Sequence, residues 1–159
     1  MDEVVKILTA KHKTIATMES CTGGGLVNAI TNIEGASEVL KFSAITYSNE
    51  YKIMMGVSSK ILKKYSVYSI ETAMEMSTNI AKFANADYGI GITGKLNKID
   101  KNNLIGSDNQ VFVSIYDKEK CVYYNFDLIV DQKSRKENKE EIVKRKEQII
   151  IMWHNIYDN

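Results

Sequence analysis

A polar, glycine-rich segment near the N-terminus holds the residues best suited to chemistry. It reads Glu-Ser-Cys-Thr-Gly-Gly-Gly over residues 19–25. A β-like run precedes it and an amphipathic run follows it, so the pattern predicts a strand, a tight turn and a helix. N–H groups and the dipole at the start of that helix would favour negative charge, as on an anionic ligand or an acyl-transfer oxyanion. Ser20 would be the reacting group. The other interpretation is a capped turn that only lets the chain reverse.

A serine hydroxyl needs a base to remove its proton. Of the two histidines, His12 precedes the first predicted strand and His154 lies near the end of the last helix, so neither is placed at the turn. A lysine with a lowered pKa can serve instead. Tyr47 and Lys52 lie five residues apart across a predicted strand-to-helix turn and could face one pocket, with Tyr47 relaying or orienting the proton. The ordinary alternatives are a solvated helix lysine and a strand-end aromatic.

Two neighbours of Ser20 have more than one interpretation. Cys21 is a rival nucleophile, because a thiol at a helix N-terminus has a depressed pKa. Glu19 could be an acid or base, a partner for a lysine, or a structural carboxylate that bonds the next helix. The sequence has no cluster of metal ligands at a recognisable spacing, and the glycines lack the Lys-Ser/Thr ending of a phosphate-binding loop. We therefore expect no metal and no organic cofactor.

Composition limits the classes of partner. The chain has 159 residues, 44% of them hydrophobic, which predicts one domain over residues 1–159. A net charge of +1 gives no field that would draw it to nucleic acid or to an anionic membrane, and no apolar run is long enough to span a bilayer. The acidic start and the two cysteines predict a cytoplasmic protein with reduced thiols. An apolar stripe on the last helix leaves a homo-oligomer possible.

The predicted elements must bring these residues together. Strands are predicted at 14–18, 39–47, 88–93, 111–116 and 121–128, and helices at 4–13, 22–32, 48–56, 58–65, 69–84 and 134–157. The helix over 69–84 has Ala73, Met76, Ile80 and Phe83 on one side. Alternating strands and helices followed by a late hairpin predict an α/β fold, a three-layer αβα sandwich with a mixed sheet. Polar segments at 19–25, 47–52 and 93–97 follow strands, where such sheets bind ligands.

Three motifs resemble the signatures of a known family. They are Thr-Met-Glu-Ser-Cys-Thr-Gly-Gly at 17–24, Thr-Tyr-Ser-Asn-Glu-Tyr-Lys at 46–52, and Ala-Asp-Tyr-Gly-Ile-Gly-Ile-Thr-Gly at 86–94. They are similar to the CinA-like family, the C-terminal domain of competence/damage-inducible proteins, whose stand-alone members include nicotinamide-nucleotide amidases. The resemblance implies an αβα domain that hydrolyses the carboxamide of nicotinamide mononucleotide. The products would be nicotinate mononucleotide and ammonia, a step of pyridine nucleotide salvage.

The resemblance also implies roles for individual residues. The family's serine, tyrosine and lysine fall on Ser20, Tyr47 and Lys52, with the serine as nucleophile and the lysine as base. The N–H groups of Thr22 and Gly23 could hold the oxyanion. The family's last helix begins with arginines, a role that Arg145 or Arg135 could fill. The residues expected to bind substrate are Glu19, Thr22, Gly23, Gly24, Thr93, Gly94 and Arg145.

One segment departs from the family pattern. After Ile-Thr-Gly the family continues with a loop rich in glycine and proline, whereas residues 95–110 contain a single glycine, Gly106. Backbone that closely approaches a ligand commonly needs glycine. The alternative function is therefore a catalytically inactive or altered-specificity relative. It would bind a nucleotide or a protein partner through the same cleft, in a competence or DNA-damage context.

Overall fold

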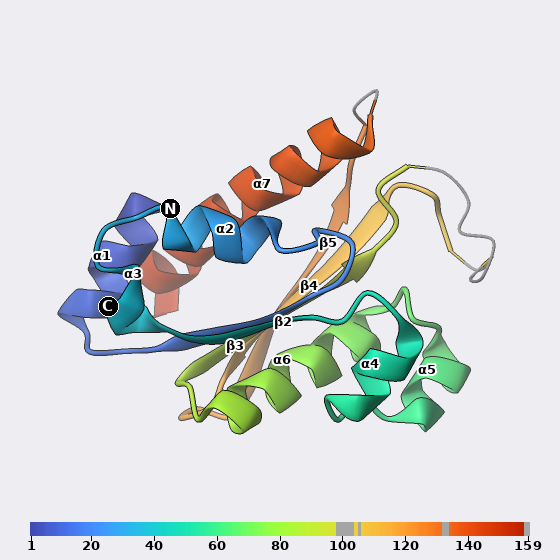
Figure 1. Cartoon of the computed structure of the whole chain (residues 1–159), viewed down its shortest axis with the longest axis horizontal. Helices are drawn as coiled ribbons and strands as arrows, with labels where there is room; N and C mark the ends of the chain where they lie inside the picture. The colour runs from blue at the N-terminus through green and yellow to red at the C-terminus, as the bar shows by residue number, and fades with distance from the viewer. Residues whose placement is uncertain (98–103, 105, 132–133, 158–159) are drawn as a thin grey trace.

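A mixed β-sheet forms the centre of the molecule. The computed structural model describes residues 1–97, 104, 106–131 and 134–157, and within them five strands pair in the order β2-β1-β3-β4-β5 (Figure 1). The strands are β1 (Ile15–Glu19), β2 (Leu40–Ile45), β3 (Tyr88–Gly94), β4 (Gln110–Asp117) and β5 (Val122–Ile129). β1 is parallel to both β2 and β3, while β4 is antiparallel to β3 and to β5. The carboxyl ends of β1, β2 and β3 therefore meet at one edge.

Helices cover both faces of this sheet (Figure 1). One face carries α1 (Asp2–Ala10), α2 (Gly25–Thr31), α3 (Ala36–Val39) and α7 (Arg135–Tyr157). The other carries α6 (Ile70–Ala84), with α4 (Asn49–Met54) and α5 (Ser59–Tyr65) beside its N-terminal half. The predicted three-layer αβα sandwich with a mixed sheet is confirmed. Within the described residues, no helix is both long enough and apolar enough to cross a membrane.

Alternation along β1 sends its side chains into two separate cores. Ile15 belongs to the core beneath α1, α2 and α7, whereas Ala16 and Met18 belong to the core beneath α6. The period of two puts Glu19 on the α2 side, and Ser20, the next residue, on the α6 side. Ser20 and Glu19 thus leave the strand in opposite directions.

The glycines of β3 let α6 lie directly on the sheet. A Cβ at Gly89 would overlap the carbonyl oxygen of Ser77, and a Cβ at Gly91 would overlap that of Ala73. Both carbonyls belong to α6. Glycine is needed here because backbone meets backbone, which fixes the height of α6 above the strand.

Most predicted elements are present, with three differences. The short helix α3 was not predicted, and β2 starts after it at Leu40 and ends at Ile45. Phe83 was placed on the buried side of α6, but it is 66% exposed, with its ring centroid 5.1 Å from that of Phe42 on edge strand β2. In α7, Ile142 and Ile149 are buried as the spacing predicted, while the side chains of Trp153 and Ile156 lie outside the described residues.

The segment predicted as a loop over 95–109 is only partly described. Residues 95–97, 104 and 106–109 belong to no helix or strand. Residues 98–103 and 105 lie outside the described residues. The start of the segment is nevertheless fixed, because the Lys95 N–H donates to the carbonyl oxygen of Gln110 at 2.9 Å.

Candidate functional site

Ser20 sits at the carboxyl end of β1, held by the strands on both sides. Its N–H donates to the carbonyl oxygen of Ile92 on β3 at 3.1 Å. The N–H of Thr46, just after β2, donates to the carbonyl oxygen of Glu19 at 2.8 Å. The side chain is buried, with 7% of its surface exposed. Paired backbone on two sides fixes the position of the Ser20 backbone.

Lys52 reaches Ser20 from α4. Ser48 caps this short helix, since its side chain accepts from the Tyr51 N–H at 3.4 Å. The Lys52 side chain is 1% exposed, and its Nζ donates to Ser20 Oγ at 3.0 Å and to the carbonyl oxygen of Thr46 at 2.6 Å. Two hydrogen bonds thus aim the amine at the serine hydroxyl.

Burial changes the acid–base behaviour of this lysine. Desolvation disfavours the ammonium form and lowers the pKa of Lys52 from 10.5 to about 8, while the charge of nearby Cys21 opposes that change. At neutral to slightly alkaline pH, part of the Lys52 amine population is therefore in the neutral form. A neutral amine 3.0 Å from a hydroxyl can accept its proton, which is the arrangement of a nucleophile with its general base.

The glycine turn is left-handed at two successive residues, Gly23 (φ 57°) and Gly24 (φ 91°). The Gly23 N–H donates to the Ser20 carbonyl oxygen at 2.9 Å, so this predicted oxyanion donor already has an acceptor. Among the described residues, the Thr22 N–H has no hydrogen-bond acceptor. The oxyanion role therefore stays a prediction for Thr22 and loses support for Gly23.

Glu19 was expected to bind substrate, a role that stays a prediction, and its contacts support the structural alternative. The carboxylate is fully buried and accepts from Thr22 Oγ1 at 2.6 Å, from the Leu26 N–H at 3.1 Å and from the Val27 N–H at 2.8 Å. These are groups of the turn and of the first turn of α2, whose N–H groups have no partner within the helix. Glu19 therefore holds the start of α2, the structural alternative that the sequence had left open.

Thr93 and Gly94 lie at the carboxyl end of β3, next to Ser20, with structural partners. Thr93 is fully buried and its hydroxyl donates to the carbonyl oxygen of Val67 at 2.8 Å. A Cβ at Gly94 would overlap the backbone of Gln110 and Val111 on β4. Their substrate-binding role remains a prediction. The contacts seen here join Thr93 to the segment before α6 and pack Gly94 against β4.

Tyr47 is not joined to the serine–lysine pair by any hydrogen bond within the described residues. Its side chain is 64% exposed, and its hydroxyl accepts from the Arg135 guanidinium at 3.2 Å. The contact links the loop after β2 to the first turn of α7. Its role as a proton relay stays a prediction.

The cations of α7 with contacts near the turn are Arg135 and Lys139. Arg145 donates to the carbonyl oxygen of Ile129 on β5 at 2.9 Å and pairs with Glu141, so its substrate-binding role stays a prediction without support from these contacts. Arg135 bonds Tyr47, and the Nζ of Lys139 lies 3.5 Å from the position of a Cβ on Gly23. Lys139 was missed in the sequence, although residues four apart share one helix face, which is the signal that pairs it with Arg135.

The other candidate groups are the histidine near the first strand, the cysteine next to Ser20 and possible metal ligands. His12 precedes β1 and so lies at the opposite end of that strand from Ser20. Cys21 is buried next to Ser20, but its role as a rival nucleophile is untested. The described residues contain no group of three or more His, Cys, Asp and Glu side chains that could hold a metal ion.

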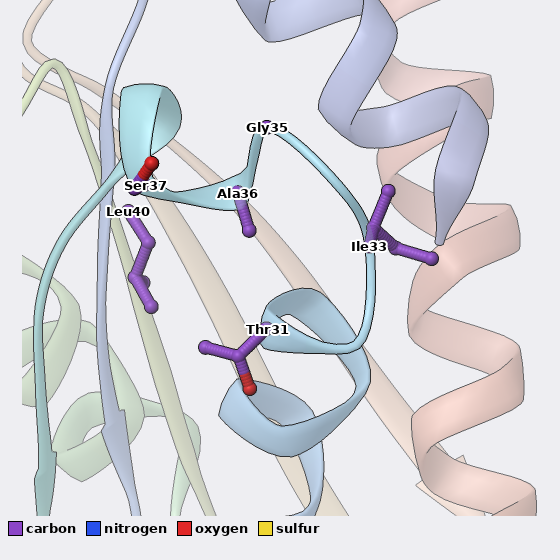
Figure 2. Close-up of a pocket in the computed structure, with 6 residues that line it drawn as sticks. All are labelled: Thr31, Ile33, Gly35, Ala36, Ser37 and Leu40. Atoms are coloured by element: carbon purple, nitrogen blue, oxygen red, sulfur yellow. The ribbon is translucent and has the colours of Figure 1, made fainter.

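A hollow of about 380 Å³ lies elsewhere on the molecule (Figure 2). It is lined by residues around the α2–α3 connection, from Thr31 to Leu40, with side chains that are apolar or carry only hydroxyls. Leu40 begins β2, so this hollow lies at the amino ends of the parallel strands. It is therefore separate from the site at Ser20.

The fold and the site define an α/β protein with a buried serine–lysine pair at the carboxyl end of its central parallel strand. Comparison with known proteins then gives the family. Residues 1–148 match the family described as the CinA C-terminal domain, and the chain belongs to that family.

The relatives agree with this assignment. Over 96 residues the chain is 48% identical to a putative competence-damage inducible protein of Thermoanaerobacter sp., covering 59% of this chain and 23% of that protein. Over 113 residues it is 39% identical to a CinA-like protein of Flavobacterium psychrophilum, covering 69% and 26%. The matched part thus spans about a quarter of these curated relatives.

Solved structures show the same fold. A CinA superfamily protein from Klebsiella pneumoniae superimposes with a TM-score of 0.86 at 21% identity, covering 96% of this chain and 93% of that one. A competence/damage inducible protein from Agrobacterium tumefaciens gives a TM-score of 0.83 at 23% identity, covering 94% and 90%.

Proposed function

We propose that this chain is an amidohydrolase that converts nicotinamide mononucleotide to nicotinate mononucleotide and ammonia. Ser20 is the nucleophile and Lys52 its general base. The observation that carries the proposal is the 3.0 Å contact between Lys52 Nζ and Ser20 Oγ, made by a lysine that is 1% exposed. A solvated helix lysine would be exposed and charged, whereas this one is buried with its pKa lowered to about 8.

The steps follow from the positions of these groups. Neutral Lys52 takes the Ser20 proton, and Ser20 Oγ attacks the amide carbon to form a tetrahedral intermediate. The lysine then gives the proton to the leaving nitrogen, which departs as ammonia and leaves an ester on Ser20. Water hydrolyses that ester to the acid. The Thr46 carbonyl oxygen, 2.6 Å from Nζ, keeps the amine aimed at the serine throughout.

Cations near the turn support a substrate that carries a phosphate. Arg135 and Lys139 lie on one face of α7, one bonded to Tyr47 and the other beside Gly23. A guanidinium and an ammonium together suit a phosphate group. In this proposal they bind the phosphate of the nucleotide, while Ser20 meets its carboxamide.

A second candidate function rests on the segment after β3. The Lys95 side chain is 2% exposed, its Nζ is 5.0 Å from the centre of the Tyr68 ring, and Asp108 lies 3.9 Å away. A buried lysine here occupies space next to Thr93, where the family pattern has a glycine-rich loop. This favours a relative with altered specificity that binds a different nucleotide or a protein partner.

Ammonia release from nicotinamide mononucleotide tests the proposal. The purified chain should release ammonia, and Ser20→Ala should abolish it. A known nicotinamide-nucleotide amidase, run in parallel, sets the amount of enzyme at which turnover must appear. No turnover at that amount would refute the amidase, and tight nucleotide binding without turnover would favour the second candidate.

A further inference from the structure

Three hydroxyl residues form a row across the carboxyl ends of the parallel strands. Glu19 pairs with Ile45 on β2 and with Ile92 on β3. One residue further along, Ser20 therefore lies between Thr46 and Thr93. Ala44 on β2 packs against the core beneath α6, so the period of two directs Thr46 to the same side of the sheet as Ser20.

The two threonines that flank Ser20 differ in their hydrogen bonds. Thr93 donates to the Val67 carbonyl oxygen at 2.8 Å. Thr46 is 2% exposed, and its Oγ1 has no hydrogen-bond partner among the described residues. Its backbone, in contrast, is fully used, because its N–H bonds Glu19 and its carbonyl oxygen accepts from Lys52 Nζ.

A buried hydroxyl without a partner is costly and rare in native proteins. Its place beside the serine–lysine pair suggests that the partner arrives with the reaction. The water that hydrolyses the acyl-enzyme must reach the carbonyl carbon on Ser20 while Lys52 Nζ takes its proton. Thr46 Oγ1 belongs to the residue whose carbonyl oxygen already bonds that Nζ, and it faces the same side of the sheet as Ser20.

We propose that Thr46 is a positioning residue whose hydroxyl donates to the hydrolytic water and selectively promotes deacylation. This inference rests on the proposed serine mechanism, and it assigns to Thr46 a role that the first half of the reaction does not need.

The step balances as an ordinary ester hydrolysis. The water oxygen forms a bond to the acyl carbon as one water proton passes to neutral Lys52 Nζ. The bond between that carbon and Ser20 Oγ then breaks, and Lys52 returns the proton to Ser20 Oγ. The product is a carboxylic acid, and Thr46 ends the step with the hydroxyl proton it began with.

An activated ester separates the two halves of this reaction. With p-nitrophenyl acetate, acetylation of Ser20 appears as a burst of p-nitrophenolate and deacetylation as the slower steady rate. Thr46→Val removes the hydroxyl while keeping the shape of the side chain. We expect its burst rate to match the wild type and its deacetylation to slow about tenfold or more, as expected when a reacting group is misplaced. Thr46→Ser should restore deacetylation.

Thermal unfolding of matched variants excludes a merely structural role. Thr46→Val should not lower the unfolding midpoint, because the hydroxyl it removes has no partner to lose. Thr93→Val should lower it, because the Val67 carbonyl oxygen loses its donor. Equal losses of burst and steady rate in Thr46→Val, wild-type deacetylation, or a fall in midpoint like that of Thr93→Val would each overturn the role of Thr46.

The same assay separates this inference from the proposed substrate. A Ser20-dependent burst in a protein that does not hydrolyse nicotinamide mononucleotide would refute only the substrate. A wild-type trace identical to that of Ser20→Ala would refute the nucleophile, and with it the role of Thr46.

Discussion

Replacing Lys52 with methionine should remove the part of the pH dependence of stability that comes from the buried amine. Lys52 is 1% exposed and its pKa in the folded protein is lowered from 10.5 to about 8 by desolvation. Methionine fills similar space, cannot titrate and is tolerated in a core. A comparison of the two proteins therefore isolates the titration of one side chain.

The direction follows from proton linkage. Between pH 8 and 10.5 the unfolded chain keeps a proton on Lys52 that the folded protein has released, so wild-type stability rises with pH across this window. As the pH falls from 10.5 to 8, that stability is lost. The gap between 10.5 and about 8, at about 1.4 kcal/mol per pKa unit, corresponds to about 3 kcal/mol. Methionine also removes the hydrogen bonds of Lys52 to Ser20 and Thr46. Their loss lowers the stability of Lys52→Met by about 1–3 kcal/mol, with little dependence on pH.

Urea unfolding at pH 7, 8, 9, 10 and 10.5 measures the effect. Other tyrosines, lysines and cysteines titrate in both proteins, so the informative quantity is the difference in the free energy of unfolding. We expect the free energy of unfolding of the wild type, relative to that of Lys52→Met, to rise by about 3 kcal/mol from the lowest to the highest pH. Parallel curves would mean that the amine is not held in its neutral form, and the general-base reasoning would fail.

The other predictions concern Glu19 and the cations of α7. Glu19→Gln should lower the free energy of unfolding by about 2–3 kcal/mol, because an amide NH₂ would replace one of the oxygens that accept from Thr22, Leu26 and Val27. Urea unfolding measures this, and an unchanged midpoint would contradict the structural role. Arg135→Ala should raise the KM for nicotinamide mononucleotide several-fold, whereas Arg145→Ala, on the β5 side of α7, should leave it within about twofold. Equal effects would show that neither arginine meets the phosphate selectively.

The order of elements could be predicted from the sequence because it depends on local pattern. A short apolar run marks the buried strand over 88–93, and capping residues such as Ser48 and Ser69 mark helix starts. The candidate nucleophile and base could also be predicted from the sequence. Ser20 and Lys52 each follow a strand, and the parallel strands of the sheet end at one edge. The prediction from helical spacing was wrong for Phe83, which lies beside Phe42 on edge strand β2 and is largely exposed. Helical spacing does not reveal where the sheet beneath a helix ends.

What only the tertiary structure decided are the partners of each polar group. Whether Glu19 meets a ligand or the start of α2, and whether Arg135 or Arg145 reaches the turn, depends on where α2 and α7 lie on the sheet. The sequence by itself determined the order of the elements and offered Ser20 and Lys52 as candidates, with a solvated helix lysine as the alternative. Hydrogen bonds and burial arise from residues far apart in the chain, so the buried Lys52 and the unpartnered hydroxyl of Thr46 emerge only once the strands pair and the helices cover them.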